Sequence, residues 1–254
     1  MAVARDRHGG RRSARETASL SCLGIAYAMS TSSEFRVEVV MFDVVETLFS
    51  LEAVGVRLAA AGAGDRALEL WFTRFLRDGF ALAASGTYQP FREVAASSLS
   101  SVLRASGIEP NERLEAHILA ALLELEPYPD ARPALEYLAD RGVRAMTLTN
   151  GAAAATQGLL ERAGLRTLVE ATLTVEETKA WKPRPEPYLA ACRAADVAPA
   201  RAALVAVHSW DIHGAARAGL QTGWCSRLEG HFPAVFARPS VRGETLVDVV
   251  KQLA

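Results

Sequence analysis

Cysteine is scarce in this chain, and long apolar runs are missing from it. The three cysteines, Cys22, Cys192 and Cys225, form neither a C-x-x-C pair nor a cluster with histidine. This usage disfavours a disulfide framework and a zinc site, so we interpret the thiols as reduced and mostly structural. Arg, Glu or Asp interrupts each Ala/Leu-rich segment before about 20 apolar residues have passed, and the sequence therefore predicts no membrane span.

An excess of one charge sign is also missing, because the formal net charge is -1 although 22% of the residues are charged. Neither nucleic acid nor an anionic membrane is therefore an expected partner. The 254 residues, of which 50% are hydrophobic, suffice for a sizeable core. These properties are typical of a cytoplasmic enzyme that acts on a small molecule.

Residues 1–34 differ from the rest of the chain. They are rich in Arg and Ser, and a short apolar run before Met29 imitates a secretory signal. The run is short for a signal core, and Ser19 interrupts a lipid-attachment pattern ahead of Cys22. We predict a disordered leader or extension, with translation from Met29 as an alternative.

The remaining chain divides into a helical segment and an alternating one. Residues 35–42 are mostly apolar and β-branched, which predicts a strand buried on both faces of a parallel sheet. Residues 53–127 carry only helical signals, separated by Gly, Pro or Asn. Further strands are expected at residues 144–148, 171–175, 202–207 and 222–226, with helices between them and a last helix at 244–253. This order predicts an α/β fold with three αβα layers, built from residues 35–50 and 129–254, and an inserted all-helical cap at 51–128.

Polar side chains follow several of these strands. Ligands of open parallel sheets bind beyond the carboxyl ends of the strands, so these side chains are candidates for a site. Taken singly, each has an ordinary explanation as a turn residue, a helix N-cap or a surface lysine. The candidates are Asp43, Thr149 with Asn150, Lys182 in a Lys-Pro pair, and His208 with Asp211.

The order of these residues along the chain resembles the motifs of the haloacid dehalogenase superfamily. That order is a strand-end Asp, a strand-end Thr, a Lys-Pro pair and a second strand-end Asp. Residues 42–49 (FDVVETLF) and 207–216 (VHSWDIHGAA) are most similar to the type II 2-haloacid dehalogenases. Their first motif reads D-x-x-G-T-L-F, and their last contains W-D-x-x-G-A. The resemblance covers about residues 37–254 and implies a Rossmann-like core with a cap.

The resemblance also implies catalytic roles. Asp43 matches the nucleophile that becomes transiently esterified, and Lys182 matches the lysine that neutralises charge. Asp211 matches the acid that holds this lysine and helps to activate water, while Thr47 and Thr149 position the reacting groups. A lysine near Asp43 would keep the carboxylate ionised and nucleophilic, so the physical logic agrees.

The substrate-binding part departs from the family pattern. Phe72 stands where the family has an arginine that binds the substrate carboxylate, and Arg74 points to nearly the opposite side of its helix. Glu46 replaces the usual glycine of the first motif, which we expect to reshape the entrance of the site. The predicted substrate-binding side chains are Asn150, Tyr188, His208, Val45, Trp71 and Phe72.

Two absences distinguish between the branches of the superfamily. Val45 replaces the acid with which phosphatases protonate their leaving group, and Ala206 replaces an acidic magnesium ligand. We therefore predict a dehalogenase type of hydrolase without metal or cofactor, in a cytoplasmic protein for which the resemblance also allows a homodimer. The alternatives are a magnesium-dependent phosphatase in which His208 or Glu46 replaces the missing acid, and a non-catalytic binding protein.

Overall fold

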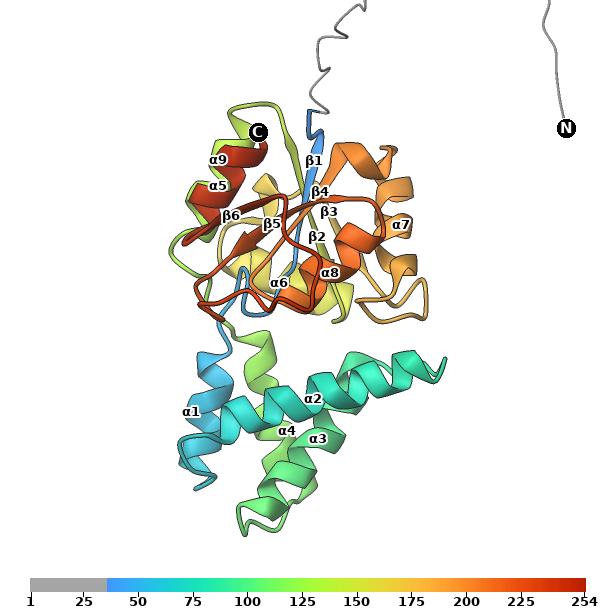
Figure 1. Cartoon of the computed structure of the whole chain (residues 1–254). Helices are drawn as coiled ribbons and strands as arrows, with labels where there is room; N and C mark the ends of the chain where they lie inside the picture. The colour runs from blue at the N-terminus through green and yellow to red at the C-terminus, as the bar shows by residue number, and fades with distance from the viewer. Residues whose placement is uncertain (1–35) are drawn as a thin grey trace, which may run out of the picture. The chain divides into compact units, whose positions relative to one another are not determined.

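A parallel sheet forms the centre of residues 36–254, the part of the chain that the computed structural model describes (Figure 1). The predicted leader and Cys22 lie outside the described residues. The sheet has six strands in the order β3-β2-β1-β4-β5-β6, and all neighbours pair in parallel. The strands are β1 (Val39–Phe42), β2 (Arg144–Thr149), β3 (Ala171–Thr174), β4 (Ala202–Ala206), β5 (Gln221–Cys225) and β6 (Val241–Gly243).

Helices cover both faces of the sheet. Val39 and Met41 of β1 point toward α7 and α8, whereas Val40 and Phe42 point toward the opposite layer of α5, α6 and α9. These layers confirm the predicted αβα architecture. The helices are α5 (Ala131–Ala139), α6 (Ala153–Arg162), α7 (Pro185–Ala194), α8 (Ser209–Arg217) and α9 (Leu246–Leu253), with short 3-10 turns η2 (Arg166–Leu168) and η3 (Pro199–Arg201).

The segment between β1 and α5 forms the predicted helical cap. Its core contains Trp71 and Phe75 on one helix and Leu99 and Leu103 on the next, all of them buried. Among the helices described, none combines the length and the apolar character that crossing a membrane requires. The cap helices are α1 (Glu52–Ala60), α2 (Ala67–Ala84), α3 (Phe91–Ala105) and α4 (Glu112–Ala120), followed by the 3-10 turn η1 (Ala121–Leu123).

The two linkers between core and cap run side by side. The Ser50 amide donates to the Glu126 carbonyl at 2.9 Å, and the Tyr128 amide donates to the Leu48 carbonyl at 2.9 Å. Glu46 adds a side-chain contact to each linker, because its carboxylate accepts from the Leu51 amide at 2.6 Å and from the Tyr128 hydroxyl at 2.8 Å. These bonds tie the first motif to the base of the cap.

Glu46 therefore has a different role from the predicted one at the entrance of the site. Its φ of 63° is in the left-handed region, which explains why glycine suits this position in the family. Burial, and then the Glu46 charge, raise the pKa of Tyr128 to about 12, so its hydroxyl stays protonated and donates. The carboxylate of Glu46 is occupied by the linkers, which argues against its replacing the acid of a phosphatase.

The prediction missed β6 and misplaced the starts of several helices by one to three residues, α8 and α9 among them. β6 has only three residues, Val-Arg-Gly, and lacks the apolar pattern by which a strand is recognised. Helix α9 begins at Leu246 instead of 244, because Thr245 and Asp248 form a capping box there. Helix α8 begins at Ser209, whereas the sequence predicts a helix from Ile212, three residues later.

A glycine in α8 allows close packing against the Lys182–Pro183 loop. A Cβ on Gly214 would lie 2.6 Å from the Tyr188 hydroxyl oxygen and 2.8 Å from the Pro183 carbonyl oxygen. Gly158 lies inside α6, and a Cβ there would meet nothing within 4 Å. The two helical glycines thus differ only in the space around them.

We expect Gly214→Ala to lower the free energy of unfolding by about 1–3 kcal/mol, because the added methyl group overpacks the loop. The matched variant Gly158→Ala should raise it by about 0.5–1 kcal/mol through helix propensity. Urea denaturation measures both values. Equal stability of the two variants would contradict the close approach of α8 to this loop.

Candidate active site

The candidate residues from four separate loops meet at the carboxyl edge of the sheet. Asp43 directly follows β1, Asn150 follows β2, Lys182 lies in the loop after β3, and Asp211 lies in the first turn of α8 after β4. The strand order places β1 between β2 and β4, so the ends of these strands are neighbours. The parallel topology therefore brings together side chains that are distant in the sequence.

The Lys182 ammonium group occupies the centre of this arrangement. Its Nζ donates to Asp43 Oδ1 at 2.9 Å, to Asp211 Oδ2 at 2.6 Å and to the Leu148 carbonyl at 2.8 Å. The side chain is 0% exposed, so all three ammonium donors are used by protein acceptors in place of water. Lys182 thereby fixes the spacing of the two carboxylates.

The electrostatics separate the roles of the two acids. Burial raises the pKa of the Asp43 carboxyl, but the Lys182 charge and the hydrogen bond from His208 outweigh it and hold that pKa well below its ordinary value. For Asp211, burial dominates and the pKa is raised despite the charge of Lys182. Asp43 is thus the carboxyl group that stays ionised, and Asp211 has the greater tendency to take up a proton.

The second oxygen of Asp43 has its own donors. The Thr47 hydroxyl donates to Asp43 Oδ2 at 2.8 Å and accepts from the Val207 amide at 3.2 Å. His208 Nδ1 lies 3.1 Å from the same oxygen, and this nitrogen carries the proton because an ionised carboxylate only accepts. His208 Nε2 is buried and has no hydrogen-bond partner within residues 36–254.

Two of the predicted substrate-binding residues hold other site residues in the structure. Asn150 Oδ1 accepts from the Lys182 amide at 2.9 Å, which orients the loop after β3. The Tyr188 hydroxyl donates to Asp211 Oδ1 at 2.5 Å, and its side chain is fully buried. Tyr188 is therefore a positioning residue and does not line the cavity, which corrects its assignment as a substrate contact.

Trp71 and Phe72, the two aromatic cap residues predicted to bind substrate, face in different directions in the structure. Trp71 lies in the interior of the cap, where its indole donates to the Ala95 carbonyl at 3.0 Å, so the structure contradicts a substrate-binding role for it. The Phe72 ring faces the core, with its centroid 5.7 Å from that of His208. Arg74 donates to the Ser101 carbonyl at 3.1 Å, away from the site as its helical position predicts.

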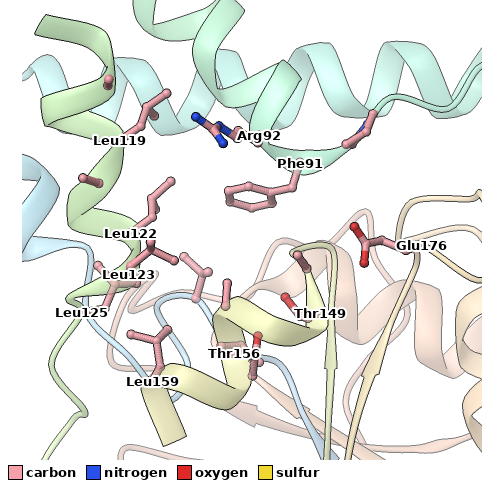
Figure 2. A pocket seen from close by; sticks show the side chains of 17 residues that line it. Phe91, Arg92, Leu119, Leu122, Leu123, Leu125, Thr149, Thr156, Leu159 and Glu176 are labelled. Carbon is pink, nitrogen blue, oxygen red and sulfur yellow. The ribbon is translucent and has the colours of Figure 1, made fainter. Parts of the chain in front are cut away.

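A cavity of about 360 Å³ lies between cap and core (Figure 2), and its lining reaches the two residues after Asp43 but does not include Asp43 itself. Val44 and Val45, which directly follow Asp43, line it together with Thr149, whose hydroxyl accepts from the Gly151 amide at 2.9 Å. Most other lining side chains are apolar. They include Phe91, Leu119, Leu122, Leu123, Leu125 and Leu159.

The cavity also contains residues that the sequence analysis missed. Arg92 and Glu176 are its charged side chains among the described residues, and helical periodicity does not indicate that the first turn of α3 faces the core. Trp210, in the last motif, is a further residue near the site that the sequence analysis does not predict. Its ring stacks 5.3 Å from His208, and its Nε1 is buried without a partner in the described chain.

The donor set does not fit a magnesium ion. The Lys182 ammonium already lies between the two carboxylates that would bind the cation, and Val45 and Ala206 offer no side-chain oxygen. Over residues 36–254, no group of three or more His, Cys, Asp or Glu side chains is arranged to hold a metal. The charge that a metal ion would supply here comes from an ammonium group.

Two curated relatives are similar to this chain over most of its length. The (S)-2-haloacid dehalogenase of Xanthobacter autotrophicus is 30% identical over 194 residues, which is 76% of this chain and 76% of the relative. The (S)-2-haloacid dehalogenase 4A of Burkholderia cepacia is 30% identical over 184 residues, 72% of this chain and 80% of the relative. The similarity thus includes both cap and core.

The fold agrees with this similarity. The structure of the L-2-haloacid dehalogenase from Xanthobacter autotrophicus with chloropropionic acid covalently bound superposes with a TM-score of 0.78 and 26% identity. It covers 85% of this chain and 98% of that one. The family model for haloacid dehalogenase-like hydrolases matches residues 37–219. The chain therefore belongs to the haloacid dehalogenase-like hydrolase family and is a hydrolase.

Proposed function

We propose that this protein hydrolyses carbon–halogen bonds of small organic substrates through an ester of Asp43, without a metal ion. The arrangement that carries the proposal is the buried Lys182 ammonium between Asp43 and Asp211, beside an aliphatic Val45. A valine cannot protonate a leaving group, and a halide leaves without a proton. The similarity to enzymes named haloacid dehalogenases supports the same conclusion.

In the first step, a carboxylate oxygen of Asp43 attacks the carbon that carries the halogen. A carbon–oxygen bond forms, the carbon–halogen bond breaks, and the halide leaves with the bonding electrons. The charge of Lys182 and the hydrogen bonds from Thr47 and His208 keep the attacking carboxylate ionised. The aliphatic cavity wall at Val44 and Val45 limits competing water.

In the second step, water hydrolyses the ester. A base takes one proton from water, the resulting hydroxide attacks the carbonyl carbon of the Asp43 ester, and the product alcohol leaves with a proton. Asp211, whose pKa burial raises, is the proposed base. Lys182 lies next to the oxygen on which negative charge develops, so it stabilises the tetrahedral intermediate.

Oxygen-18 labelling tests the covalent route. In a single turnover in labelled water, we expect the label in Asp43 and an unlabelled oxygen in the alcohol, because the product oxygen comes from the carboxylate. Mass spectrometry of a peptide containing Asp43 detects the label. Label that passes directly from solvent into the product would contradict the ester mechanism. In a separate assay, turnover of a phosphate ester that EDTA abolishes would favour the phosphatase alternative.

Replacement of the nucleophile provides a second test. We expect Asp43→Asn to reduce kcat by about a thousandfold or more, because an amide oxygen is a poor nucleophile. Halide release from a panel of haloacids and uncharged organohalides measures this loss. Unchanged halide release by a folded variant would show that another group attacks the substrate.

After the Lys182 charge, the hydrogen bond from His208 should contribute to the position of the acid limb of the pH–rate profile. The pKa of Asp43 is lowered, so activity is present above that pKa and is lost as the pH falls through it. His208→Ala removes one cause of the lowering, so the limb should move to higher pH and kcat/KM should fall by about 10- to 100-fold. His208→Asn retains an amide donor for Asp43 and should restore much of the difference, whereas His231→Ala, on an exposed side chain, is the control. An acid limb that stays in place in His208→Ala would contradict this role.

A homodimer and a cytoplasmic location are also part of the proposal. The cap carries exposed apolar side chains, Val56 at 62% and Leu123 at 56%, which supports association between copies of the chain. Sedimentation velocity tests the dimer directly.

A further inference from the structure

The charges that line the cavity are unevenly placed. Figure 2 shows Arg92 on the cap side, next to Leu119 and beyond the Phe91 ring, while Glu176 lies away from it near the core loops. Between these charges the wall is apolar apart from Thr149 and Thr156. A cavity of this kind fits an elongated apolar ligand that has one anionic end directed toward Arg92 and away from Glu176.

Arg92 has no ion pair or hydrogen bond within residues 36–254. Several other cap arginines are engaged, since Arg57 pairs with Glu124 and Arg104 pairs with Glu109 at 2.8 Å, whereas Arg113, exposed like Arg92, also has no partner within the described residues. Arg92 also stands in the first turn of α3, which has no side-chain cap and whose N-terminal end adds partial positive charge. Its guanidinium donors are therefore free for a ligand carboxylate.

The position of Arg92 indicates where the substrate carboxylate lies relative to the reacting carbon. Phe72 fills the position of the family's carboxylate-binding arginine and packs against His208 and Phe75. The Lys182 donors are all used, so no cation beside Asp43 is left for the carboxylate of a short 2-haloacid. Arg92, on cap helix α3, and Val45, in the first motif of the core, both line the apolar cavity.

Resting on the proposed dehalogenase function, we propose that Arg92 binds the carboxylate of a medium-chain haloacid whose halogen is remote from that carboxylate. The halogen-bearing carbon lies at Asp43, and the methylene chain lies along Phe91, Leu119 and Leu122. About 360 Å³ is ample room for such a chain. The cap thus recognises the acid end, and the core performs the reaction at the other end.

A comparison of substrates tests this proposal in the full-length protein. Wild type should dehalogenate ω-bromohexanoate and ω-bromooctanoate with higher kcat/KM than bromoacetate. Arg92→Met should raise KM for the two ω-bromoacids by about 10- to 100-fold, the effect of losing a charge-assisted pair, and should leave KM for uncharged bromohexane unchanged. Arg92→Lys should restore part of the affinity, and Arg113→Met, on an exposed cap side chain that does not line the cavity, is the matched control.

A binding measurement separates recognition from the reaction. By calorimetry, hexanoate should bind wild type more tightly than hexanol does, and Arg92→Met should remove that preference. A wild type that binds hexanoate through Arg92 but releases no halide from any bromide would defeat the dehalogenase function alone. Equal effects of Arg92→Met on charged and uncharged ligands, or a preference for bromoacetate, would overturn the role of Arg92.

Discussion

The site depends on one buried cation. Lys182 is 0% exposed and donates to two carboxylates and a carbonyl, so three charged groups are removed from water together. Such a cluster is stable only while each charge keeps its partners, because removing one leaves an uncompensated buried charge that costs about 3–5 kcal/mol. Much of the surrounding structure serves this geometry: Asn150 holds the Lys182 backbone, and Tyr188 holds Asp211.

The same cluster explains the division of labour between the two acids. Both carboxylates are buried and share one ammonium group, but Asp43 receives two further side-chain hydrogen bonds, from Thr47 and His208. Asp211 receives one, from the neutral Tyr188 hydroxyl. Burial outweighs the Lys182 charge at Asp211 but not at Asp43, so their pKa values move in opposite directions, and the two residues suit the proposed roles of base and nucleophile.

The cap and the core contribute different functions. The core edge, built from strand ends, holds the candidate reacting groups, while the cap supplies much of the apolar wall and the cation of the cavity. Glu46 and Tyr128 join the two at the linkers, so the first catalytic motif is also the base of the cap. Substrate specificity can thus change on the cap while the chemistry of the core is retained.

The sequence by itself determined the layer order and the approximate position of the chemistry. A strand buried on both faces of a parallel sheet appears in the sequence as an apolar run, and ligands bind beyond the ends of such strands. The sequence therefore identifies Asp43, Lys182 and Asp211 as candidate site residues. The sequence does not predict the three-residue strand β6, because its composition lacks a strand pattern. It becomes a strand only through its pairing with β5. Only the tertiary structure decided that Tyr188 and Trp71 are buried away from the cavity and that Arg92 reaches it. Helical periodicity identifies an apolar face, whereas the direction of that face relative to a distant loop depends on how cap and core pack together.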